Sequence, residues 1–504
     1  MQSFTVTVQQ QNEGAGRMTA VGKGYESLSR LDAAFLSFET QNAPMHVGLT
    51  LVFQEGPLRG SSGGVDMSRV RRHIEARLAR IPRYRQKLRK IPLTGDHLWV
   101  DDGKFDLENH VRHISLPKPG DASCLQRLCG EILERPLNRN RPLWEVWIVE
   151  GLADEQFAAI CKVHHCMVDG VGGLSLLQAL LGASPVEPSG LAEHWDPRPE
   201  PTEAELLQFA VRRRQNLISS ARDTVVAAMG DLANSGKALQ ERATGFLAFT
   251  RRGLPLAETM SFNQPIGPNR EVQWLSLDLA RIKAIGSSLE GTVNDVTLAT
   301  LAGGFREFLS GRGQLEGTKT VRTVVPVNRR PTDGAEALGN QASCWMVNLP
   351  LDCDNPKEAL RRIRAQTLIH KSSQSALGGE LLTQAAEWAN AGIMHRLVRA
   401  LSNLHPYNLV VTNVPGPATP LYMAGAPMVA AHPHLPLFEG QGIGIAIFRY
   451  IDRLQIGLTG DRDQVPDLDV LAESIDESFN ALEVAAGIQK AAPSKAMHAA
   501  AGAS

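Results

Sequence analysis

This chain of 504 residues has no long apolar run, no signal-peptide pattern and almost no net charge, and each absence excludes a class of protein. No apolar run approaches the ~18 residues of a membrane-spanning helix, so we expect no transmembrane segment. The N-terminus, MQSFTVTVQQQNEGAGRM, lacks a basic start followed by an apolar core, so no signal peptide is predicted. The formal net charge is only -1, whereas nucleic-acid-binding proteins usually carry a basic excess, so we expect no nucleic-acid partner. The expected location is the cytoplasm.

The six cysteines are also scattered, with no CxxC pair and no His/Cys cluster at zinc-finger spacing. Reduced thiols are therefore expected, because paired cysteines are typical of oxidising compartments. No metal and no cofactor are predicted.

The length and composition predict more than one globular unit. Apolar residues make up 43% and charged residues 21%, as is ordinary for globular proteins. A chain of this length exceeds what one hydrophobic core usually serves. Two regions, 1–26 and 489–504, have little to bury and are predicted to be flexible tails. Between them we expect an N-terminal domain at 27–185, a helical crossover linker at 186–270 and a C-terminal domain at 271–488.

Strand and helix patterns alternate within both predicted domains, which favours the α/β class. At the start of the first domain, Ser29 is expected to cap a helix with Leu31, Ala34, Phe35 and Phe38 on one face. The remaining expected elements are a basic helix at 68–80, strands at 144–149, 157–163, 274–279 and 321–327, helices at 293–309, 357–373 and 466–485, and a hairpin at 442–461.

The most informative motif is HHCMVDG, which directly follows the apolar strand at 157–163. This order places His164 and His165 at the C-terminal end of a strand, where ligand sites of α/β sheets gather. A neutral imidazole is well matched to take a proton from an alcohol near pH 7. Asp169 is placed to brace the loop, and Gly170 allows a turn and a close approach of substrate. The pattern predicts a histidine general base.

Three other interpretations of the motif stay open at this point. A histidine in a core is often structural. His165 and Asp169, at i and i+4, are also compatible with a metal site, although no further ligand accompanies them and the pattern is not HExxH. Cys166 is a candidate nucleophile, but adjacent residues at a strand end point to opposite sides, which disfavours a dyad with His165.

The motif HHCMVDG resembles the HHxxxDG motif of chloramphenicol acetyltransferase-like enzymes, peptide-synthetase condensation domains and bacterial wax ester synthase/diacylglycerol acyltransferases. Other segments are similar to the last group, in the expected order from about residue 28 to 485. They are LSRLDAAFLSFETQNAPMHVG, RPLWEVWIVEGL, SFNQPIGPNR, TVNDVTLATLAGGFREFL, VPVNRRP and NVPGP. Condensation domains usually carry a DFGWG-like element where this chain reads GIGIAIFRY, and we expect no carrier domain to accompany it.

The resemblance implies two chloramphenicol-acetyltransferase-like domains with the active site in a channel between them. It implies acyl-CoA as the donor and a fatty alcohol or diacylglycerol as the acceptor. It assigns His165 as the general base, His164 as its supporting neighbour, and Asp169 and Gly170 as structural members of the site. Carrier-protein-dependent acyl transfer, as in condensation domains, and a non-catalytic lipid-binding homologue remain the alternatives.

Two further elements carry over as substrate-binding candidates. Pro142, Leu143 and Trp144 match the family's PLW element, which is expected to shape the site. Asn294 and Asp295 match its ND element. However, Thr292 and Asp295 also fit a helix capping box, which explains Asp295 without any role in catalysis.

The segment 203–252 combines a modest basic excess with interleaved apolar residues. Such a pattern fits peripheral association with an inner membrane or lipid inclusions, and it equally fits an ordinary linker packed on both domains.

Overall fold

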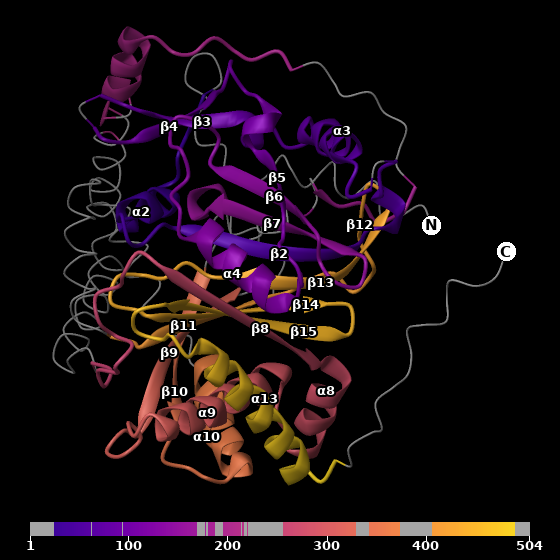
Figure 1. Ribbon diagram of the computed structural model, residues 1–504. Helices are drawn as coiled ribbons and strands as arrows, with labels where there is room; N and C mark the ends of the chain where they lie inside the picture. The colour runs from indigo at the N-terminus through magenta and orange to yellow at the C-terminus, as the bar shows by residue number, and fades with distance from the viewer. Residues whose placement is uncertain are drawn as a thin grey trace.

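The computed structural model describes residues 25–61, 63–92, 94–168, 177, 180–186, 195–212, 214–215, 219, 256–328, 342–372 and 406–488. Within these residues, two six-stranded sheets and one three-stranded sheet form the body of the molecule (Figure 1). The expected α/β class is confirmed, and the parallel and antiparallel pairs within each large sheet make both sheets mixed. No described helix is long and apolar enough to span a membrane.

The first large sheet carries the HHxxxDG strand near its centre. Its order is β12-β13-β2-β7-β6-β5, with β12 Tyr422–Met423, β13 Ala426–His434, β2 His46–Gln54, β7 Gln156–His164, β6 Trp144–Glu150 and β5 Val111–Ser115. All of β7 except its first residue is buried, which explains its nearly continuous apolar sequence. Around this sheet lie α2 Arg30–Phe38, α3 Met67–Leu78 and α4 Ala122–Leu133.

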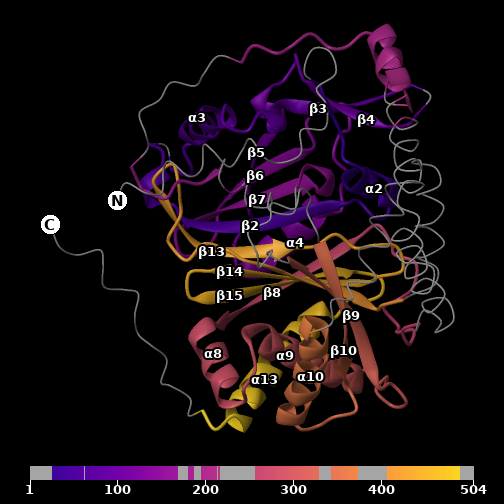
Figure 2. The same cartoon turned by 180° about the vertical axis from the view of Figure 1, so that it is seen from behind.

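The second large sheet has helices on one face and the first half of the chain on the other (Figures 1 and 2). Its order is β10-β9-β11-β14-β15-β8, with β10 Ala342–Pro350, β9 Thr320–Asn328, β11 Leu409–Val414, β14 Ile443–Tyr450, β15 Arg453–Asp461 and β8 Arg270–Asp278. The helices are α8 Leu279–Ser288, α9 Val293–Gly311, α10 Pro356–Ser372 and α13 Leu468–Ala485. The expected hairpin at 442–461 is confirmed as β14 and β15.

The third sheet is small and lies next to the start of the predicted linker. Its order is β1-β4-β3, with β1 Glu26–Ser27, β4 His97–Asp101 and β3 Gln86–Lys90. Short 3-10 helices complete the first half, namely η1 Gly56–Leu58, η2 Pro82–Arg85, η3 Leu107–Asn109 and η4 His165–Met167. Residues 203–212 are helical, and Leu206 and Ala210 pack there against Tyr25, Ile91, Leu98 and Val100. Most of the remaining segment to residue 252 lies outside the described residues.

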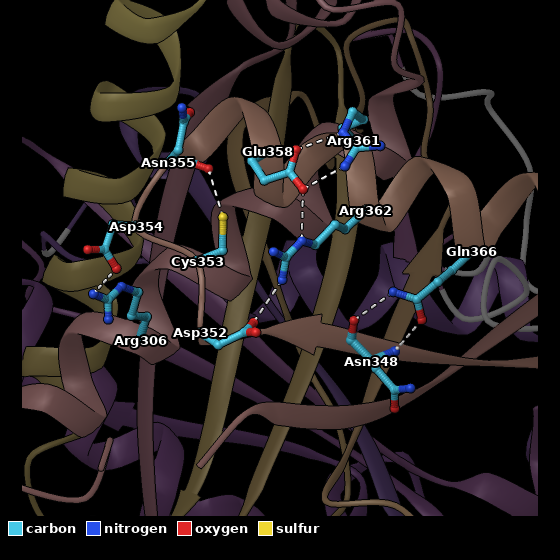
Figure 3. A network of polar contacts seen from close by, with 10 residues as sticks. All are labelled: Arg306, Asn348, Asp352, Cys353, Asp354, Asn355, Glu358, Arg361, Arg362 and Gln366. Carbon is cyan, nitrogen blue, oxygen red and sulfur yellow. Dashed lines mark hydrogen bonds and ion pairs between the residues drawn. The ribbon is translucent and has the colours of Figure 1, made fainter. Parts of the chain in front are cut away.

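Among the described residues, side chains of α10 and not a further strand cover one edge of the second sheet. Gln366 of α10 accepts a hydrogen bond from Asn348 N and donates one to Asn348 O, both at 2.9 Å (Figure 3). His370, one turn later, bonds Met346 O at 2.9 Å. Because these two side chains occupy main-chain groups of the edge strand β10, they reduce its capacity to pair with another chain.

The two sheets do not divide the chain at the predicted linker. β13 lies within the predicted domain 271–488, yet it pairs with β2 of the first half, for example at His432 with Thr50. The predicted domain boundaries stay a prediction. The structure adds that one strand of the second half, β13, belongs to the sheet of the first half. Local patterns do not reveal this exchange, because they do not specify which strand pairs with which.

Candidate active site

The HHxxxDG loop is held from both sides by the main chain of neighbouring segments. His164 is the last residue of β7, and its N–H donates to Leu143 O at 2.9 Å. His165 begins η4, and its N–H donates to Met45 O at 2.8 Å. The side chain of His164 caps this turn, since its Nδ1 accepts from Cys166 N at 3.1 Å. The backbone at both histidines is therefore fixed by the residues that directly precede β6 and β2.

The two imidazoles differ in their access to solvent. His164 is only 1% exposed, and its Nδ1 is occupied, so it has no route to an alcohol substrate. His165 is partly exposed. Its Nδ1 is buried and bonds to no other residue among those described, which leaves Nε2 as the nitrogen that can meet a substrate. His165 is thus the more accessible of the two imidazoles, and its assignment as the general base stays a prediction.

Burial keeps both rings uncharged near neutral pH. It lowers the pKa of His165 to about 4; the residue's own backbone carbonyl acts in the opposite direction, and His164 lowers the pKa further. Burial also lowers the pKa of His164 to about 3, with the charge of Arg139 as a second cause. A ring with a pKa below 7 is unprotonated at pH 7, so His165 has a free lone pair for an incoming proton.

A carboxylate lies next to the buried histidine. Glu39 caps the C-terminal end of α2, and its Oε2 is 3.7 Å from His164 Nε2. Its Oε1 is 3.7 Å from Nε2 of His46, and Arg139 forms an ion pair with it. The rings of His46 and His164 meet edge-on, with centroids 5.9 Å apart. Local sequence patterns do not identify Glu39, His46 and Arg139, because nothing in them shows that segments so far apart in the chain meet here.

The PLW element lies directly beside the motif. Leu143 supplies the carbonyl that holds His164, and Trp144 pairs with Val163 of β7. The Trp144 indole is 1% exposed and donates to Tyr84 O at 2.8 Å. Such burial indicates support of the loop rather than contact with substrate. The predicted roles of Pro142, Leu143 and Trp144 in substrate binding stay predictions.

The ND element has a clear structural role. Thr292 and Asp295 form the expected capping box at the start of α9, which is confirmed. The second carboxylate oxygen of Asp295 accepts from Thr367 of α10 at 2.7 Å. Asp295 is therefore fully engaged within the helical layer of the second half, and the structure does not place it against the HHxxxDG loop. Substrate binding by Asp295 and by the partly exposed Asn294 stays a prediction.

The remaining predicted site residues, Asp169 and Gly170, lie outside the described residues. The described part of the site also has a small cleft between the two halves, lined by Pro44, His46, Leu133, Arg270, Leu435, Pro436, Leu437 and Thr459. No group of three or more His, Cys, Asp or Glu side chains in the described part is placed to hold a metal ion.

Comparison with known proteins is consistent with this arrangement. Residues 28–297 match the family model described as the wax ester synthase/diacylglycerol acyltransferase catalytic domain, and residues 338–483 match the WS/DGAT C-terminal domain. A Mycobacterium tuberculosis protein named as a diacylglycerol O-acyltransferase is 31% identical over 487 residues, covering 93% of each chain.

Solved structures show the same fold. The wax ester synthase/diacylglycerol acyltransferase from Marinobacter aquaeolei VT8 is 26% identical, with a TM-score of 0.64 over 92% of this chain and 100% of that chain. The starter condensation domain of rhizomide synthetase, at 13% identity, shares the fold alone, with a TM-score of 0.55 over 92% and 94% of the two chains.

Proposed function

This chain belongs to the wax ester synthase/diacylglycerol acyltransferase family, and we propose that it transfers a long-chain acyl group from acyl-CoA to the hydroxyl of a fatty alcohol or a diacylglycerol. The observation that carries the proposal is the partly exposed, uncharged imidazole of His165 beside the fully buried His164. The products are a wax ester or a triacylglycerol, together with free CoA.

The proposed reaction is one direct transfer. Nε2 of His165 takes the hydroxyl proton while the alcohol oxygen attacks the thioester carbonyl carbon. The carbon–sulfur bond then breaks, and the proton on Nε2 passes to the CoA sulfur, so protons balance within one turnover. Burial raises the pKa of the Cys166 thiol, which leaves it protonated and a poor nucleophile. An acyl-cysteine intermediate is therefore not part of the proposal.

The experiment that tests this function measures CoA release from palmitoyl-CoA with hexadecanol or dioleoylglycerol. Release is expected only when donor and acceptor are both present, because no covalent acyl-enzyme forms. Intact-mass spectra of the chain after incubation with palmitoyl-CoA alone should show no added acyl group. No turnover with either acceptor contradicts the proposed substrates, and an acylated chain contradicts direct transfer.

We also propose that the protein associates peripherally with membranes or lipid inclusions, where its apolar substrates partition. On the described helix at 203–212, Leu207 is 39% exposed and Val211 is 55% exposed, and both lie on the face next to the one that buries Leu206 and Ala210. Exposed apolar side chains on one helix face are suited to enter the interfacial region of a bilayer.

Replacing both Leu207 and Val211 with Asp is expected to weaken binding to anionic liposomes by about tenfold or more, because each buried apolar side chain contributes roughly 1.5–3 kcal/mol. Flotation assays measure the bound fraction. Val484→Asp, at a 75% exposed position of α13, is the matched control and should float like the unmodified chain. Equal flotation of all three proteins contradicts a role for this helix face.

A further inference from the structure

An aromatic ring lies flat on the candidate base. The rings of Phe35 and His165 are nearly parallel, at 15°, and their centroids are 3.6 Å apart. Phe35 is on α2, whose N-terminus is fixed by Ser29, which accepts a hydrogen bond from Asp32 N at 3.0 Å. The contact therefore joins a well-anchored helix to the one-turn helix that carries the base.

The His165 ring has little else to orient it among the described residues. Its Nδ1 bonds to no other residue there, and the hydrogen-bonding group that acts on its pKa is its own backbone carbonyl. A general base has to be held in one orientation, as the histidine of a serine-protease triad is held by a carboxylate. In the described part of the site, the group that lies against the His165 imidazole and can set its orientation is the face of the Phe35 ring.

We propose that Phe35 is a positioning residue for the general base, with its ring fixing the plane of the His165 imidazole so that Nε2 faces the acceptor hydroxyl. At 3.6 Å, rotation of the imidazole about its Cβ–Cγ bond brings ring edges into the Phe35 face. The stack thus restricts that rotation without a hydrogen bond. This inference rests on the proposed function of His165.

The same contact has an electrostatic consequence. The Phe35 face excludes water from one side of the imidazole, and burial is the largest cause of the lowered pKa of His165. Loss of the aromatic ring is expected to hydrate this face and to stabilise the imidazolium. The pKa of His165 then rises from about 4 toward its ordinary value near 6.5.

The test compares Phe35→Leu with the unmodified chain, using palmitoyl-CoA and hexadecanol between pH 4.5 and 8. A misplaced catalytic group costs up to about 10²-fold, so kcat should fall roughly 10- to 100-fold, with KM changed by less than about threefold. The acid limb of kcat/KM should move to higher pH, because more of the base is protonated at each pH. Phe35→Tyr keeps the aromatic ring, so its kcat and the acid limb of its kcat/KM profile should equal those of the unmodified chain.

Phe38→Leu is the matched control on the same helix. Phe38 lies 6.0 Å from the Phe35 ring and 5.6 Å from Phe438, and none of its ring contacts involves His165. Its pH profile should equal that of the unmodified chain. The inference is overturned if Phe35→Leu has the unmodified kcat and pH profile, or if both leucine variants show the same loss with an unshifted profile. Absence of CoA release by the unmodified chain overturns the proposed function instead.

Discussion

His165→Ala is expected to lose about 10²–10⁴-fold in kcat, because a positioned general base contributes a factor of that size. The fold should persist, since the backbone N–H of residue 165 still donates to Met45 O and the side chain is only partly buried. His164→Ala should act differently, because it removes the cap on Cys166 N and leaves a cavity in the core. Its larger effect should be on thermal stability, with a smaller loss of kcat.

Steady-state CoA release and thermal melts of both variants separate these effects. His113→Ala is a matched control, since this exposed histidine of β5 pairs with Glu150 away from the loop. It should retain activity. Near-normal turnover by His165→Ala would falsify the mechanism, whereas a loss of turnover caused by unfolding appears in the melts.

A second large effect is expected from the length of the acceptor. A site whose chemistry needs one hydroxyl holds the rest of the molecule mainly through apolar contact, worth about 0.8 kcal/mol per buried CH₂. An apolar cluster of Ala43, Met45, Ile266 and Leu437 lies beside His165, whose backbone N–H donates to Met45 O. We therefore expect kcat/KM to rise by at least about 10³-fold from ethanol to long-chain primary alcohols.

The measurement is kcat/KM for primary alcohols from C2 to C18 with palmitoyl-CoA, and for dioleoylglycerol, in mixed micelles of constant composition. Discrimination between neighbouring long chains should be weak, because apolar pockets distinguish a methylene by only about 1–3 kcal/mol. A flat profile, or a preference for an amine or a thiol over every alcohol, contradicts the proposed acceptor class.

The sequence predicted those parts of the fold whose cause is local. The Ser29 cap, the Thr292–Asp295 capping box and the strand before His164 all follow from short-range rules, and the structure confirms them. The pairing of β13 with β2 was not predicted, because strand pairing depends on packing across the whole chain.

In the candidate site too, local features could be predicted from the sequence and long-range contacts could not. The motif indicated two adjacent histidines at a strand end, and the structure distinguishes their burial. The carboxylate of Glu39 and the ring of Phe35 reach these histidines from α2, far away in sequence. Long-range contacts of this kind leave no spacing pattern, so residue types alone could not identify them.

The position of β13 in the first sheet affects the order of events during synthesis. Strands β2, β7, β6 and β5 leave the ribosome long before β13 has been translated. At about 5–20 residues per second, the edge of β2 stays unpaired for roughly 20–75 s. Completion of the sheet that carries His165 therefore waits until most of the chain has been synthesised, and until then the nascent chain presents the open edge of β2 to chaperones and to its neighbours on the polysome.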